Sequence, residues 1–147
     1  MSNYEAALLT IQETIRVAQQ RNEHESVALA QAWLFRIGQM EHLSQEETQS
    51  LINTCIAKSK ELHLHYLTSQ CHLESAKLHN YTSVQRNNPQ SAHNVPRALL
   101  EIQKSDRINS EHGFDDLKCT TFLTRAATWE TFGNKRLVRL KMKFFLI

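Results

Sequence analysis

The sequence contains little glycine and proline, the residues that most often form tight turns. Only three glycines and two prolines occur in 147 residues. An all-β sandwich or barrel needs turn signals about every 8–12 residues, and such signals are sparse here. Long uninterrupted helices need few of them. The composition therefore favours an all-α fold.

Cysteine is also scarce. Cys55, Cys71 and Cys119 are odd in number and widely spaced, without a CxxC pair or disulfide framework, as expected in a reducing compartment. The opening residues MSNYEAALL lack the basic start and apolar core of a signal peptide. No stretch approaches the roughly 20 apolar residues of a membrane span. We expect localisation to the nucleus and cytoplasm.

No excess of one charge is present. Seventeen basic and fifteen acidic side chains give a net charge of +2. A nearly balanced charge produces no overall field that would attract nucleic acid or a membrane surface. Neither is expected as a partner.

What the sequence does contain is amphipathic helix. Residues 4–39 predict two helices separated by a break at residues 21–24, each with one apolar face at helical spacing. The first face contains Ala7, Leu8, Ile11, Ile15 and Ala18; the second contains Val27, Ala30, Leu34 and Ile37, with Trp33 beside it and a helix exit at Gly38. A helix hairpin with small alanines at its crossing is the unit of α-solenoid repeats.

These residues also resemble known families. Tyr4, Ala7, Ile11 and Thr14 are similar to the second half of a tetratricopeptide repeat. More narrowly, LLTIQETIRVAQQRNEH and the following AWLFRIGQ resemble the anaphase-promoting complex subunit 5 family. The later residues 126–129 (AATW) and 132–133 (FG) are similar to a later helix of that family.

The resemblance implies an all-α, tetratricopeptide-like α-solenoid of antiparallel helix hairpins. It implies a non-catalytic scaffold subunit of the anaphase-promoting complex, a cell-cycle ubiquitin ligase, with the other subunits as partners and with no cofactor or small-molecule substrate. The alternative is a helical-repeat adaptor of another assembly. The residues expected to pack the repeats are Ala7, Ile11, Ile15, Ala18, Ala30, Trp33, Leu34, Gly38, Ala126, Trp129 and Gly133. Both tryptophans are expected to be buried between helices.

The predicted organisation is helical hairpins over 4–78, a polar loop over 79–95, further helices over 96–133 and a divergent basic-apolar tail over 134–147. Ser44 and Glu47 form a capping-box pattern that predicts a helix over 45–61. Pro96 suits the first turn of a short helix. A last helix over 115–132 is expected to bury Leu117, Phe122, Leu123, Ala126, Ala127 and Trp129.

The tail leaves the family's pattern directly after Gly133. Four cations within residues 136–143 make it a candidate for a membrane surface or nucleic acid, but they are few. We interpret the tail as the end of a truncated product, and the chain as a slice of a longer family protein. The four cations are Arg136, Arg139, Lys141 and Lys143.

Two patterns suggest chemistry, and the sequence argues against both. His65, His72 and His79 recur every seven residues, which spans about 10 Å of helix, too far for one metal ion. They are expected on a polar helix flank. A nucleophilic triad could be assembled from Cys119, His112 and either Asp115 or Asp116. However, Cys119 falls on a predicted amphipathic helix and no glycine-rich loop accompanies it. We therefore expect neither a metal site nor an enzyme.

Overall fold

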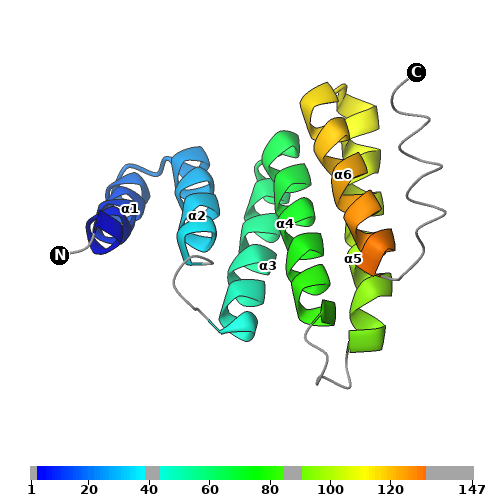
Figure 1. Cartoon of the computed structure of the whole chain (residues 1–147). Coiled ribbons are helices and arrows are strands. Elements are labelled where there is room, and N and C mark those ends of the chain that lie inside the picture. Colours follow the sequence, from blue (N-terminus) through cyan, green and yellow to red (C-terminus); the bar gives the residue numbers. More distant parts are fainter. Residues whose placement is uncertain (1–2, 39–43, 85–90, 132–147) are drawn as a thin grey trace. The chain divides into compact units, whose positions relative to one another are not determined.

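The computed structural model describes residues 3–38, 44–84 and 91–131 (Figure 1). Within these ranges the chain is helical and contains no strand, which confirms the predicted all-α fold of helical repeats. The helices are α1 (Asn3–Gln20), α2 (His24–Gly38), α3 (Gln45–Glu61), α4 (His65–Val84), α5 (Ser91–His112) and α6 (Asp115–Thr131). Gly133 and the predicted tail over 134–147 lie outside the described residues.

The same turn reverses the chain between α1 and α2, between α3 and α4, and between α5 and α6. In each turn one residue has a left-handed backbone: Asn22 (φ 55), His63 (φ 55) and Gly113 (φ 73). The next amide N–H donates back to a carbonyl five residues earlier, at 2.9, 2.8 and 3.1 Å respectively. This is the Schellman helix end, which satisfies otherwise unpaired carbonyls. A repeated turn produces repeated hairpins.

Those three carbonyls belong to buried residues: Ala18, Ser59 and Asn109. The sequence predicted the first of these breaks, at residues 21–24, but it did not show that the three turns are equivalent. The start of α3 also agrees with its sequence. Ser44 Oγ accepts from the Glu47 backbone N–H at 3.3 Å, and Glu47 Oε2 accepts from the Ser44 amide N–H at 3.0 Å, so the predicted capping box is confirmed.

The contacts divide the chain into two compact units, residues 1–71 and 72–147, and α4 contributes to both. In the first unit α1 packs on α2 and α2 packs on α3. The centre of α2 is lined with small side chains, so neighbouring helices approach closely. The buried residues of α2 are Val27, Ala28, Ala30 and Ala32. The predicted pairing of the first helix with the helix that contains Trp33 is confirmed.

In the second unit the later part of α4 packs with α5 and α6. Ala76 of α4 and Ala98 and Ile102 of α5 form a fully buried apolar cluster, with Leu99 packed against it. Polar contacts continue the interface, since Asn80 Nδ2 donates to Thr128 Oγ1 of α6 at 2.7 Å. The core of this unit is therefore part apolar and part hydrogen-bonded.

The structure corrects the expected burial of Trp33, whose side chain is 56% exposed. The reason is geometric. Helices α1 and α3 pack on α2 and together cover a wide arc of its surface. The strip that they leave uncovered contains Leu29 and Trp33, one turn apart. Two of the other residues expected to pack this hairpin, Ala18 and Ala30, are buried. The remaining four are half-buried: Ala7, Ile11, Ile15 and Leu34. Helix α2 ends at Gly38, where the sequence predicted a helix exit.

The expected buried face of α6 is also partly wrong. Leu123 is 57% exposed, Ala127 is exposed, and Phe122 and Trp129 are half-buried. Leu117 and Ala126 are buried as expected. The buried line of the helix follows Leu117 through three threonines, Thr121, Thr124 and Thr128. Threonine can be buried here because each hydroxyl donates to a carbonyl one turn earlier.

The predicted polar loop over 79–95 is too wide. Helix α4 continues to Val84 and α5 begins at Ser91, with residues 85–90 outside the described part of the chain. The composition of this stretch is polar, but Asn94 and Val95 are buried in the first turns of α5. Pro96 therefore lies within α5, five residues after its start, instead of beginning a short helix.

Candidate protein interface

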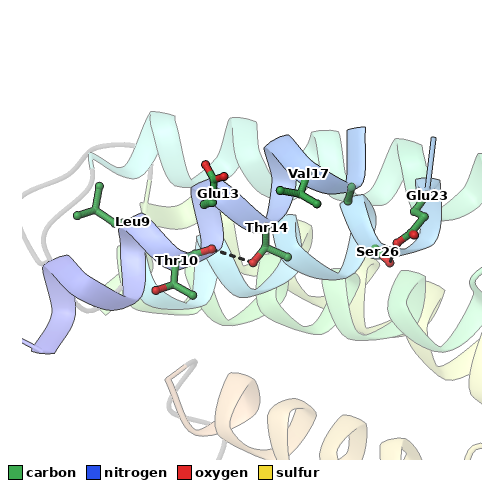
Figure 2. Close-up of a pocket in the computed structure, with 8 residues that line it drawn as sticks. Leu9, Thr10, Glu13, Thr14, Val17, Glu23 and Ser26 are labelled. Atoms are coloured by element: carbon green, nitrogen blue, oxygen red, sulfur yellow. Dashed lines mark hydrogen bonds between the residues drawn. The ribbon is translucent and has the colours of Figure 1, made fainter. Parts of the chain in front are cut away.

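The α1–α2 hairpin carries an open groove of about 590 Å³ on its surface. Figure 2 shows its lining side chains on α1, at Glu23 in the turn and at Ser26 on α2. Thr14 Oγ1 donates to the Thr10 carbonyl at 2.8 Å, so these hydroxyls are held on the helix backbone. The groove is lined by Leu9, Thr10, Glu13, Thr14, Val17, Ala18, Glu23 and Ser26.

The groove has an apolar floor and acidic edges. Leu9 is an exposed large apolar side chain, and Val17 is half-buried. Glu13 forms a bidentate pair with Arg16, at 2.6 and 2.8 Å, and this hydrogen bond lowers the pKa of Glu13. Glu23 accepts from the Ser26 hydroxyl at 3.2 Å. An apolar hollow with an ionised edge suits a protein segment better than a small polar substrate.

The same hairpin carries a second exposed apolar feature, the ridge formed by Leu29 and Trp33 on α2. Leu29 is 52% exposed. Exposed tryptophan beside exposed leucine is the kind of surface that protein interfaces use as an anchor. Sequence reasoning placed Trp33 in the core because the residue is apolar and lies beside the predicted stripe.

The histidines of the seven-residue pattern do not meet one another. His72 is 2% exposed, and its Nδ1 lies 2.6 Å from Oε2 of Glu101 on α5. The expectation that it lies on a polar flank is wrong. The rings of His63 and His65 lie 6.2 Å apart in the turn before α4. His79 has its pKa lowered, mainly by burial. Among the described residues, no group of three or more potential metal ligands is present.

Glu101 is the centre of this buried contact. It also accepts from Lys104 Nζ at 2.6 Å. Burial by itself would raise the pKa of Glu101, but the hydrogen bonds from His72 and Lys104 and their charges lower it to about 2. An ionised carboxylate can only accept, so Nδ1 of His72 carries the proton in this contact. The arrangement links α4 to α5 and requires no ligand.

A second polar cluster joins α5 to α6. Asn109 Nδ2 donates to Thr121 Oγ1 at 3.0 Å and to Ser105 Oγ at 3.3 Å, and all three side chains are buried. Thr121 Oγ1 in turn donates to the Leu117 carbonyl at 2.7 Å. Sequence reasoning missed this cluster because hydrophobic periodicity does not identify buried polar residues.

We expect Thr121→Val to reduce the free energy of unfolding by about 1.5 kcal/mol, because it removes an acceptor from the buried Asn109 amide. Urea denaturation of the full chain measures the change. The matched control is Thr120→Val, whose hydroxyl donates to the Asp116 carbonyl on an exposed part of the same helix. Equal effects of the two substitutions would show that the buried contact contributes nothing.

The residues of the proposed triad have other partners. Asp115 accepts from Lys118 Nζ at 2.8 Å, and the ring of His112 stacks on Phe114 at 5.7 Å. Cys119 is exposed on α6. None of these contacts brings the thiol to the imidazole. The described helices also include none that is long and apolar enough to cross a membrane.

The chain is similar to one family of known proteins. A family model described as anaphase-promoting complex subunit 5 matches residues 1–41. Curated proteins named "Anaphase-promoting complex subunit 5" from Pongo abelii and Homo sapiens are each 21% identical to this chain over 144 residues. The match covers 98% of this chain but 17% of each relative, so the chain spans about a sixth of their length.

The corresponding Mus musculus protein is also 21% identical, over 18% of its length. No solved structure matches the chain. These similarities confirm the resemblance to anaphase-promoting complex subunit 5 that the sequence motifs indicated.

Proposed function

We propose that this chain is a non-catalytic helical scaffold that acts within the anaphase-promoting complex through protein–protein contacts. The proposal rests on the family match and the exposed surface features lying in the same part of the chain. The residues that match the family model, 1–41, contain the α1–α2 hairpin, and that hairpin bears both the groove and the Leu29–Trp33 ridge.

The architecture supports a scaffold. Successive hairpins bury residues against their neighbours and present extended outer faces, which is how helical-repeat proteins bind partners. Two buried polar clusters also have structural partners: Glu101 bonds to His72 and Lys104, and Asn109 bonds to Ser105 and Thr121. We infer that the partners are other subunits of the complex, that the chain acts in the nucleus and cytoplasm, and that its role belongs to cell division.

The test is co-purification of the tagged full chain with subunits of the anaphase-promoting complex from dividing cells. Trp33→Ala should lower the recovered subunits at least several-fold, because an exposed aromatic anchor contributes more to binding than to folding. Its free energy of unfolding should change by less than about 1 kcal/mol, as expected for an exposed side chain.

A matched control is available on α6. Leu123→Ala also removes an exposed apolar side chain, but it lies outside the residues that match the family model. It should leave the recovery of subunits unchanged. Recovery of a different assembly with the unsubstituted chain would favour the alternative, a helical-repeat adaptor elsewhere. Unfolding of the Trp33→Ala chain would show that Trp33 acts in packing.

A further inference from the structure

Two cysteines that are distant in sequence meet in the interior of the first unit. Cys55 lies on α3 and Cys71 on α4, and their sulfur atoms are 3.0 Å apart. Both side chains are fully buried and both are free thiols. The spacing of the cysteines in the sequence gave no indication of this pairing.

We propose that Cys55 and Cys71 are a covalent modification site, and that a peroxide converts them to a disulfide that joins α3 to α4. A disulfide bond is about 2.05 Å long, so the two sulfur atoms need to approach by only about 1 Å. The thiols are already directed towards each other, since Cys71 S–H donates to Cys55 Sγ. Cys55 S–H in turn donates to the Ala28 carbonyl of α2 at 3.9 Å.

The reaction proceeds in two steps. The thiolate of one cysteine attacks a peroxide oxygen; the S–O bond forms, the O–O bond breaks, and the released hydroxide takes up a proton and leaves as water. The second thiol then attacks the sulfenic acid sulfur; the S–S bond forms, the S–O bond breaks, and a second water leaves. Two thiols lose two electrons and two protons, and hydrogen peroxide is reduced to two waters.

The burial of Cys55 and Cys71 determines how fast peroxide oxidises them and which cysteine of the chain reacts first. Hydrogen peroxide, which is small and uncharged, reaches these thiols only when the hairpin opens locally. The exposed Cys119 should therefore react first. Once either buried thiol is oxidised, its nearest reaction partner is the other cysteine of the pair. In a reducing compartment the pair stays reduced until the oxidant appears, as is usual for intracellular disulfides.

Peptide mapping of the full-length chain tests the proposal. The reduced protein is treated with hydrogen peroxide at about pH 8, where thiolate forms more readily, then blocked with N-ethylmaleimide and digested with trypsin. Lys58 and Lys60 lie between the two cysteines, so a disulfide would link the tryptic peptides 37–58 and 61–77. We expect this linked pair to accumulate, two hydrogens lighter than the two peptides together.

The same reaction in urea provides the reference. In the unfolded chain Cys119 should also pair with Cys55 and with Cys71, because lengthening a flexible loop reduces closure only slightly. In the folded chain the Cys55–Cys71 link should dominate, and Cys119→Ser should leave its yield unchanged. Separate alkylation of Cys55 and Cys71 after Cys119 has been consumed would overturn the proposal. Equal pairing patterns with and without urea would also overturn it.

A second measurement, of thermal stability, does not depend on peptide mapping. Closing the loop between the two cysteines should raise the thermal midpoint of the oxidised chain by roughly 5 °C or more. Cys71→Ser, treated in the same way, should show no rise. A lower midpoint in the cross-linked unsubstituted chain would show that the folded hairpin does not accommodate the bond, and would contradict the proposal.

Discussion

Ile102→Ala should reduce the free energy of unfolding by about 3 kcal/mol. Ile102 is fully buried on α5, against Ala76 of α4 and Ala98 of its own helix. Both alanines are small and have no side-chain freedom with which to fill the space that a truncated isoleucine leaves. The cost therefore includes the lost burial of three methyl or methylene groups together with the cavity that remains.

The matched control for this prediction lies two residues away. Leu100→Ala removes a side chain of the same size from the same helix, but Leu100 is 51% exposed. It should cost less than about 1 kcal/mol. Urea denaturation followed by circular dichroism measures both variants. If the Leu100 variant were as unstable as the Ile102 variant, burial in the Ala76–Ala98–Ile102 cluster would not explain the loss.

The ends of the helices could be predicted from the sequence because local residues determine them. Ser44 and Glu47 form their capping box within a single turn. Asn22 and Gly113 occupy left-handed positions, which asparagine and glycine adopt more readily than other residues. Such signals need no knowledge of the partner helix. The predicted break at residues 21–24 was therefore confirmed, while the polar composition of residues 79–95 was mistaken for a loop.

The buried faces could not be predicted as well, because they depend on which helices become neighbours. Hydrophobicity placed Leu123 and Trp33 inside, yet both are more than half exposed. The residues buried in their place are small or polar, such as Thr121 and Asn109, and they are paired with each other. Periodicity finds apolar stripes, whereas a hydrogen bond between residues on different helices leaves no local pattern. The contact between Cys55 and Cys71 was missed for the same reason.

The contact between His72 and Glu101 predicts a specific loss of stability in acid. The folded-state pKa of Glu101 is about 2, below its ordinary value of 4.5, because the hydrogen bonds from His72 and Lys104 outweigh the effect of burial. A lowered folded-state pKa means that the stabilisation is fully present above pH 4.5. It is lost as the pH falls from about 4.5 towards 2.

We expect this contact to contribute about 2 kcal/mol at pH 7. The full shift corresponds to about 3 kcal/mol, but solvent screens the share that Lys104 provides. Glu101→Gln retains an acceptor for His72 and cannot ionise. The unsubstituted chain should therefore be more stable than this variant by about 2 kcal/mol at pH 7, and the difference should shrink steadily between pH 5 and pH 3.

Urea unfolding of both chains at pH 7, 5, 4 and 3 measures that difference directly. The control is Asp115→Asn, because Asp115 pairs with Lys118 on the surface of the same unit and its carboxylate is exposed. Its stability relative to the unsubstituted chain should vary little with pH, since exposed ion pairs contribute little. A difference for Glu101→Gln that stays constant from pH 7 to pH 3 would mean that the His72–Glu101 contact stabilises the fold without depending on the carboxylate charge. The link between α4 and α5 would then be an ordinary neutral hydrogen bond, and the acid sensitivity of the chain would have to arise at other carboxylates.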